Sequence, residues 1–117
     1  MTLDISQLLA KECSPCTNKT PRLDSPQITL YLSALPAWQI KKGKLERELK
    51  LNDFQESLLL ANQIGQIAQK ENHHPDLFIG WKILRISLFT HAIQSLCQND
   101  FILAAKIEAI LPKSITK

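Results

Sequence analysis

The sequence predicts an α+β fold, in which helices pack on one face of a single antiparallel four-stranded sheet. Two pairs of short strand-like segments occur along the chain, each pair joined by a tight turn, and segments with helical periodicity precede, separate and follow them. Strands that follow one another through short turns pair antiparallel. The chain has 117 residues, 44% of them hydrophobic and 21% charged, which suits one compact globular domain rather than a disordered chain.

Residues 1–24 are expected to be a lead segment, and the domain is expected to span residues 25–117. The lead segment contains cysteine, proline and asparagine in a mixture typical of loops, with a short helical turn predicted over Ile5 to Lys11. Ser25-Pro26 then begins a short helix, because proline is favoured at the first helical position. Pro36 ends that helix, because a proline ring clashes with a helical backbone.

The first pair of strands is predicted between Trp38 and Leu51. Trp38 to Ile40 is expected to be a short strand, and Lys42-Gly43 supplies a turn. From Leu45 to Leu51 apolar and charged residues alternate. This alternation indicates a strand with one face on the core and the other in water, so the two segments form a predicted hairpin.

A long helix is predicted from Asn52 to about Lys70. Asn52 is a favourable N-cap, with Gln55 three residues later as in a capping box. Apolar residues then recur at helical spacing and mark the face expected to contact the core. These residues are Phe54, Leu58, Ala61, Ile64 or Gly65, and Ala68.

The second pair of strands is predicted at Leu77 to Ile79 and Lys82 to Thr90, with a bend at Gly80 between them. Alternate residues of a strand share a face. In the longer strand one face carries only apolar side chains and the other carries mixed ones. The apolar face is Leu84, Ile86 and Leu88, and the mixed face is Arg85, Ser87, Phe89 and His91.

A final helix is predicted before Pro112. Asn99 or Asp100 is the expected N-cap, since both residue types are favoured there. The helix ends before Pro112, whose ring does not fit a helix interior. Its apolar positions include Phe101, Leu103, Ala104, Ile107 and Ile110.

The three histidines of the chain are the candidate chemical groups. His73 and His74 follow the long helix in a loop, where Pro75 restricts the backbone of His74. His91 lies at the end of the predicted strand, on the side away from its apolar face. Histidine exchanges protons near neutral pH, and loops and strand ends on a rigid scaffold often carry reactive groups. The sequence therefore indicates a proton-transfer site.

Less specific interpretations stay open at this point. The histidines could be exposed residues without chemistry. Two or three histidines could bind zinc, but adjacent loop histidines seldom point at one ion, and the HExxH pattern is absent. Cys13 and Cys16 form a CxxC motif, but a structural zinc site needs four ligands and Cys97 is the only further cysteine. No metal ligands are assigned.

Composition and charge exclude several functional classes. The three glycines cannot supply the Gly-rich phosphate loops of nucleotide-binding folds. The net charge of +3 lacks a clustered basic face, so nucleic-acid binding is not expected. No apolar run approaches the ~18 residues of a transmembrane helix. With no signal-peptide pattern and an odd number of cysteines, we expect a cytoplasmic protein without membrane association or a disulfide scaffold.

The residues Asn72-His73-His74-Pro75, Trp81, Thr90-His91 and Asp100 resemble the signature of the pterin-4a-carbinolamine dehydratases. The spacing from the first histidine to the third, and from there to the aspartate, matches that family. The resemblance covers roughly Ser25 to Leu111. The CxxC motif of the lead segment is similar to one found in some bacterial-type members.

The resemblance implies an enzyme that removes water from a 4a-hydroxytetrahydropterin to give a quinonoid dihydropterin, in the recycling of tetrahydrobiopterin and without a cofactor. It implies catalytic roles for His73, His74 and His91, with His73 and His91 as the acid/base pair and His74 mainly holding the pterin. Asp100 is expected to orient His91 or a neighbour. The residues implied to contact the substrate are Trp38, Asn72, Pro75, Phe89, Thr90, Ala92 and Asp100.

The resemblance also implies partners. A homodimer or homotetramer is expected, with a functional link to a pterin-dependent aromatic amino-acid hydroxylase. The alternative is a non-catalytic protein-binding module, because the family includes dimerisation cofactors of a transcription regulator. Many relatives carry acids at the positions of Gln69 and Asn72. Acidic neighbours favour protonated histidines. The acidic limb of the pH–rate profile is therefore expected to lie at lower pH in this protein than in the relatives that carry those acids.

Overall fold

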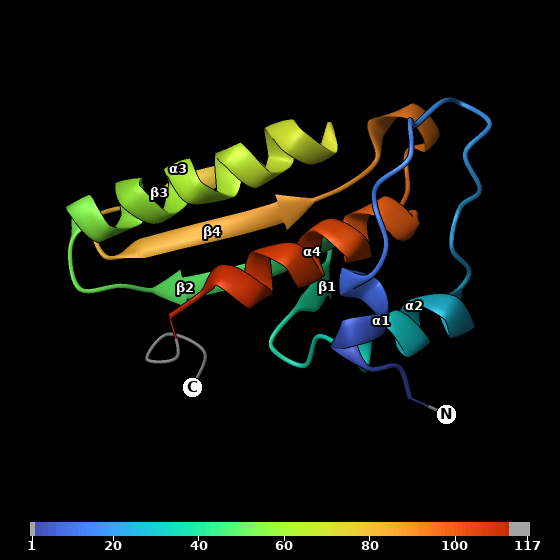
Figure 1. Ribbon diagram of the computed structural model, residues 1–117, viewed down its shortest axis with the longest axis horizontal. Coiled ribbons are helices and arrows are strands. Elements are labelled where there is room, and N and C mark those ends of the chain that lie inside the picture. The colour runs from blue at the N-terminus through green and yellow to red at the C-terminus, as the bar shows by residue number, and fades with distance from the viewer. Residues whose placement is uncertain (1, 113–117) are drawn as a thin grey trace.

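The structure is a computed structural model that describes residues 2–112 of the chain. Its four strands form one antiparallel sheet in the order β1-β2-β4-β3, with helices packed on it (Figure 1). The predicted α+β fold is therefore confirmed. Within these residues no helix is both long and apolar enough to cross a bilayer. In chain order the elements are α1 (Ile5–Leu9), α2 (Ser25–Leu32), β1 (Gln39–Lys41), β2 (Lys44–Lys50), α3 (Phe54–Glu71), β3 (Asp76–Ile79), β4 (Ile83–Leu88), the 3₁₀ helix η1 (His91–Ile93) and α4 (Gln98–Ile110).

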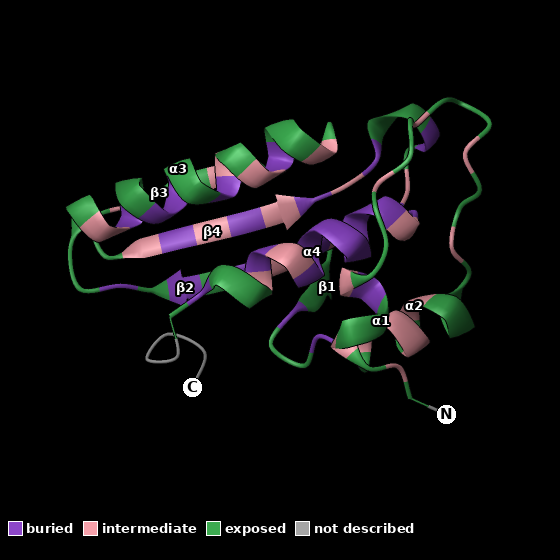
Figure 2. Cartoon of the chain, in the orientation of Figure 1, coloured by how far each residue is buried: buried purple, intermediate pink, exposed green. Residues whose placement is uncertain are grey.

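The buried face of the sheet carries the alternating leucines that the sequence predicts. Leu45 pairs with Leu88, and Leu49 with Leu84, across β2 and β4. Each of these side chains is at most 1% exposed. Figure 2 shows buried and half-buried residues alternating along β4. Burial of one leucine stabilises a fold by about 1.5–3 kcal/mol. Because a slip of one residue would turn all of these side chains to water, the burial fixes the register.

Helix α3 begins one residue later than predicted, and part of its predicted core face is wrong. Asp53, not Asn52, is the N-cap, and its Oδ1 accepts a backbone N–H three residues on at 2.8 Å. Phe54 and Leu58 are 46% and 41% exposed. The helix instead turns the small side chain of Ser57 toward the sheet, where its Oγ donates to a β4 carbonyl oxygen at 3.4 Å. The buried residues of α3 are Ser57, Leu60, Ala61, Ile64 and Ala68.

Helix α4 is buried along most of its length, with α1 and α3 as neighbours. Its N-cap is Cys97 rather than Asn99 or Asp100, so the predicted cap is wrong. Asp100 lies in the first turn, and its Oδ2 accepts the N–H of Cys97 at 3.0 Å. A carboxylate at this position reaches back to the cap as in a capping box. Cysteine is not among the favoured N-cap residues, so the sequence did not mark it.

The lead segment packs against the domain. Helix α1 lies beside α4 (Figure 1), and its Leu8 has no exposed surface. The N–H of Leu3 donates to Oγ of Ser33 just after α2 at 2.9 Å. Farther on, Ser14 forms hydrogen bonds with the side chain of Asn99 in α4. Apolar side chains between Leu3 and Cys13 therefore share one core with α4.

Trp38 lies in the core, where its indole reaches a carboxylate of α4. The side chain is 4% exposed, and its Nε1 donates to Oε1 of Glu108 at 2.8 Å. The same oxygen accepts from Nε of Arg47 at 3.1 Å. Arg47 is 8% exposed and projects from the helix-covered face of β2. Glu108 therefore satisfies two buried donors at once.

Replacement of Glu108 by alanine is expected to destabilise the fold by about 2–4 kcal/mol, because it leaves the Arg47 charge and the Trp38 N–H without an acceptor. Urea unfolding followed by tryptophan fluorescence measures the change. Glu46→Ala is the matched control, since Glu46 points to the opposite, open face of β2 and is half-exposed. Its expected effect is within about 0.5 kcal/mol, so equal losses in the two variants would contradict this account.

Candidate active site

Two loops that are distant in sequence meet at one end of the sheet and enclose a shallow hollow. One loop follows α3 and the other follows β4. The hollow has a volume of about 210 Å³. Both His73 and His91 line it, so the two histidines expected to act together share one site. The lining residues are Cys16, Asn72, His73, His74, Phe89, Thr90, His91 and Ala92.

The end of α3 determines where His73 points. Asn72 closes the helix in the left-handed region, with φ of 53°, and its N–H donates to a carbonyl oxygen of the last turn. Asparagine tolerates this conformation better than most residues and is a common helix terminator. The N–H of His73 then donates to the carbonyl oxygen of Ala68 at 3.2 Å. The chain therefore turns sharply, and the His73 side chain enters the protein and is only 8% exposed.

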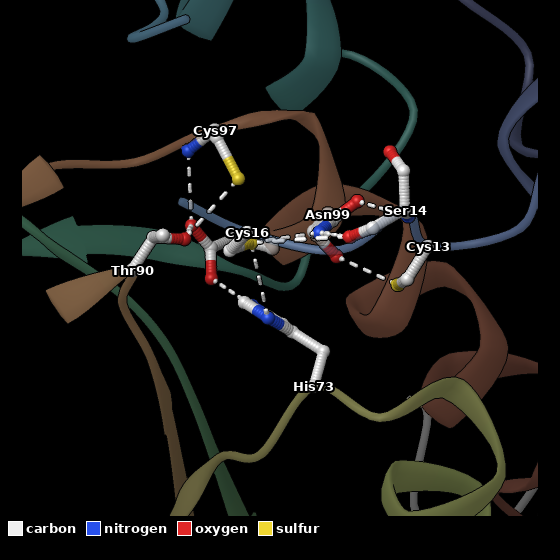
Figure 3. A network of polar contacts seen from close by, with 8 residues as sticks. Cys13, Ser14, Cys16, His73, Thr90, Cys97 and Asn99 are labelled. Carbon is white, nitrogen blue, oxygen red and sulfur yellow. Dashed lines mark hydrogen bonds and ion pairs between the residues drawn. The ribbon is translucent and has the colours of Figure 1, made fainter. Parts of the chain in front are cut away.

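His73 is held by a buried carboxylate at the start of α4. Its Nε2 lies 2.7 Å from Oδ1 of Asp100, which has no exposed surface. The other carboxylate oxygen accepts the hydroxyl of Thr90 at 2.7 Å and the N–H of Cys97 at 3.0 Å. Figure 3 shows this network around His73, Thr90 and Cys97. Since an ionised carboxylate only accepts hydrogen bonds, Nε2 of His73 carries a proton and Nδ1 is the basic nitrogen.

His91 reaches the hollow from a tight turn after β4. The strand ends at Leu88, and His91 is the first residue of η1 rather than a strand residue, which corrects its predicted place. Thr90 and Ser95 form an antiparallel bridge that closes this turn. The imidazole of His91 is exposed and packs edge-to-face on Phe89, with ring centroids 5.2 Å apart. Its backbone is thus fixed while its ring is open to a ligand.

His74 lies at the rim and is oriented by α3. Its Nε2 lies 2.5 Å from Oε1 of Gln69. An amide oxygen accepts, so Nε2 of His74 donates this hydrogen bond. The ring is exposed and takes no part in the Asp100 network. His74 is therefore placed to contact a ligand at the edge of the hollow.

Three residues expected at the substrate site do not line the hollow. Trp38 lies in the core beside Glu108, as described above. Pro75 is half-buried next to the hollow. Asp100 lies behind His73 and orients that histidine, not His91. Its position suits a residue that acts through His73 rather than by touching a substrate.

Sequence reasoning missed the part that Cys16 of the lead segment and Asn99 of α4 play here. Cys16 lines the hollow, with its Sγ 4.0 Å from Nδ1 of His73 and 2.9 Å from Nδ2 of Asn99. The available signals were the CxxC motif and the neighbours of Asp100 in sequence. Neither says that the two segments meet. Their contact spans more than 80 residues and depends on packing of α1 against α4.

The other two cysteines are poor nucleophiles. Burial raises the pKa of Cys13 to about 12, and the nearby Glu71 carboxylate adds to this effect. Burial also raises the pKa of Cys97. The pKa of Glu71 is lowered, chiefly because the backbone N–H of Cys13 donates to it, with help from Lys106. Both thiols therefore stay protonated at neutral pH.

A metal centre has no support in the described part of the chain. Among residues 2–112, no three side chains of histidine, cysteine, aspartate or glutamate are arranged to hold a metal ion. The contacts of His73 with Asp100 instead resemble the way that proteins orient a histidine for proton transfer, with a carboxylate on one ring nitrogen and the other nitrogen toward the reactant.

Comparisons with known proteins agree with this geometry. The family model described as "Pterin 4 alpha carbinolamine dehydratase" matches residues 21–110. A protein of Alkaliphilus metalliredigens named "Putative pterin-4-alpha-carbinolamine dehydratase" is 44% identical over 106 residues, which cover 89% of this chain and 96% of the relative. A protein of the same name from Methylococcus capsulatus is 37% identical over 110 residues, covering 92% and 96%.

A solved structure from Brucella melitensis, described as a "transcriptional coactivator/pterin dehydratase", has a similar fold. It aligns with a TM-score of 0.74 and 28% sequence identity, over 79% of this chain and all of that one. The matched family region contains both loops of the hollow and the Asp100 network. The chain therefore belongs to the pterin-4a-carbinolamine dehydratase family.

Proposed function

We propose that this protein is a 4a-hydroxytetrahydropterin dehydratase that acts in the recycling of tetrahydrobiopterin. The observation that carries the proposal is the shared hollow, which brings His73 and His91 together although one follows a helix and the other a strand. Family membership supports the substrate class. The acid/base chemistry needs only groups that the chain itself supplies.

The reaction breaks the bond between C4a and the hydroxyl oxygen of the pterin. One proton must reach that oxygen so that water can leave, and the N5 proton must depart as the C4a–N5 double bond forms. The product is the quinonoid dihydropterin, and the overall change is the loss of one water molecule. Two groups that titrate near neutral pH meet both needs.

His73 suits the role of proton acceptor. Its Nδ1 has a lone pair while Nε2 donates to Asp100. When Nδ1 takes a proton, the buried carboxylate faces the new positive charge at 2.7 Å and stabilises it. His91, exposed on the other loop, suits the role of proton donor to the leaving hydroxyl.

The size of the hollow suits the ring system of the pterin better than the whole substrate. Its volume of about 210 Å³ lies below the usual ligand pocket of about 300–1,000 Å³. We infer that the bicyclic pterin ring enters between the two loops, while its side chain stays in solvent. The main chain of Asn72 to His74 and of Phe89 to Ala92 would contact the ring, and His74 would hold its edge.

The direct test is dehydration by the purified protein. A pterin-dependent aromatic amino-acid hydroxylase generates the 4a-carbinolamine, and its decay is followed by ultraviolet absorbance with and without this protein. Faster decay, in proportion to the protein added, is the expected result. An unchanged decay rate at micromolar protein would refute the proposal. Size-exclusion chromatography with light scattering tests the expected homodimer or homotetramer.

The Brucella structure's description as a coactivator raises a protein-binding function as a second candidate. The intact histidine hollow favours the enzyme, because a binding module does not need two histidines around a shared cleft with a buried carboxylate behind one of them. A protein that binds a transcription regulator but leaves the carbinolamine unchanged would reverse this preference.

Gln69→Glu is expected to move the acidic limb of the pH–rate profile to higher pH. The new carboxylate would replace the amide oxygen now 2.5 Å from Nε2 of His74. A negative charge favours the protonated imidazole, so a higher pH is needed to reach the neutral form. Steady-state kcat/KM between about pH 5 and 9 measures the limb, and an unmoved limb would show that His74 does not influence the rate.

A further inference from the structure

The lead segment contributes a wall to the proposed active site. Residues 13–16, here called the strap, cross the start of α4 beside the end of α3, as Figure 3 shows for Cys13, Ser14 and Cys16 beside Asn99. The strap lies outside residues 21–110, the part that matches the family model. Its Cys16 nevertheless lines the same hollow as His73 and His91.

Hydrogen bonds hold the backbone of the strap against α4 and the end of α3. The side chain of Asn99 binds both backbone groups of Ser14, donating from Nδ2 to the carbonyl oxygen at 2.6 Å and accepting the N–H on Oδ1 at 3.1 Å. The N–H of Cys13 donates to Oε1 of Glu71 at 2.9 Å. Asn99 is 4% exposed, and its Nδ2 also donates to Sγ of Cys16 at 2.9 Å, so its amide is committed to the strap. The backbone of the strap is therefore fixed relative to α4.

This fixed backbone sets Cys16 against the basic nitrogen of His73. The Sγ of Cys16 lies 4.0 Å from Nδ1, while Nε2 on the other side of the ring binds Asp100 at 2.7 Å. The imidazole is thus enclosed between the strap and α4. A thiol is a weak hydrogen-bond donor, and its bulk keeps water away from one side of Nδ1. Both effects disfavour a proton on Nδ1, whereas the Asp100 carboxylate on the other side of the ring favours it.

We infer that Cys16 is a positioning residue for His73, which covers one side of Nδ1 and holds that nitrogen toward the hollow. The inference rests on the proposed function for its catalytic meaning, but the contact itself can be tested without substrate. The titratable groups that contact the ring are Asp100 from α4 and Cys16 from the strap, and His74 and His91 line the same hollow. Of these, only Cys16 comes from outside the matched family region.

The experiment is a pH titration of the imidazoles by NMR in the wild type, Cys16→Ala and Cys13→Ala. The chain has only three histidines, so their signals are readily assigned. In Cys16→Ala water reaches the side of Nδ1 that the thiol now covers and solvates the imidazolium, so the titration midpoint of His73 is expected to rise by about half a pH unit or more. The midpoints of His74 and His91 are expected to stay within about 0.2 units, since their environments are unchanged.

Cys13→Ala is the matched control. It removes a thiol from the same strap but leaves the hydrogen bonds of Ser14 with Asn99 and of Cys13 with Glu71 intact, because the strap forms them with backbone groups. It is therefore expected to move no midpoint. An unmoved His73 in Cys16→Ala, an equal shift in Cys13→Ala, or equal shifts of all three histidines would each overturn the inference. The acidic limb of kcat/KM should move with the His73 midpoint. If no form of the protein dehydrates the pterin, the proposed function fails while the titration still decides the role of Cys16.

Discussion

Alanine in place of His73 or His91 is expected to lower kcat for pterin dehydration about 10²–10⁴-fold in each case, the usual contribution of a general acid or base. The two side chains line one hollow from different loops. When either is removed, water must take over one of the two proton transfers. Single-turnover decay of the 4a-carbinolamine, corrected for the uncatalysed reaction, measures the loss.

The two variants are expected to differ in stability, so the experiment must separate a loss of folded protein from a loss of catalysis. His91 is exposed, so His91→Ala should change stability by less than about 0.5 kcal/mol. His73 is buried against Asp100, and its loss leaves a carboxylate oxygen without its partner. His73→Gln therefore accompanies His73→Ala, because its amide can still donate to Asp100 but exchanges no proton at neutral pH.

His74→Ala is the internal comparison. The ring of His74 is tied to Gln69 at the rim and has no buried carboxylate behind it. Its removal should cost less than about tenfold in kcat and act mainly on KM, as expected for a group that holds substrate. Losses below about tenfold for both His73 and His91 would contradict their assignment as the acid/base pair.

The sheet could be predicted from the sequence because its signal is local. Leu45, Leu49, Leu84 and Leu88 alternate with polar residues, and that alternation alone determines which face of each strand is buried. Antiparallel pairing within each hairpin then follows from the short turns, whereas the pairing of β2 with β4 joins segments on either side of α3. The long helix, predicted from Asn52 to about Lys70 and found at Phe54–Glu71, also has a local signal in the helical spacing of its apolar residues. Its core face was predicted wrongly in part, because the helix is rotated so that Ser57 faces the sheet.

The supporting contacts of the site could not be predicted, because each joins segments distant in sequence. Ser14 meets Asn99, Cys16 meets His73, and Trp38 meets Glu108. No local pattern in either segment records such a contact. Asp100 shows the difference clearly. Its importance came from resemblance, whereas its partner, His73 rather than His91, depends on how α4 packs against the end of α3.

The site therefore combines two kinds of positioning. Local backbone devices, the left-handed Asn72 and the bridge between Thr90 and Ser95, set where each histidine leaves the main chain. Long-range contacts then set how the His73 ring is oriented and which nitrogen is basic. Replacement of a long-range partner should impair the chemistry without dismantling the loops, and Asp100 offers the clearest case.

Asp100→Asn is expected to lower kcat about 10²–10⁴-fold while the protein stays folded. The asparagine has nearly the same shape, but only one of its two terminal atoms accepts hydrogen bonds. The N–H of Cys97 and the hydroxyl of Thr90 converge on one carboxylate oxygen, so the amide oxygen goes there and Nδ2 faces His73. The proton of His73 must then move to Nδ1, although the proposed reaction needs a lone pair on that nitrogen to accept the N5 proton. A histidine held in the wrong tautomer accounts for a loss of about 10⁴-fold in serine proteases.

Two measurements separate this tautomer effect from simple damage. Nitrogen-15 NMR of His73 should show the proton on Nε2 in the wild type and on Nδ1 in Asp100→Asn. Asp53→Asn makes the same chemical change at the N-cap of α3, where asparagine caps as well as aspartate, so its rate and stability should match the wild type. Full activity in Asp100→Asn, or a lost rate with the tautomer unchanged, would mean that the buried carboxylate does not select the basic nitrogen. The reaction would then depend on His73 in some way other than as a base at Nδ1, because that role requires the carboxylate to hold the proton on the far side of the ring.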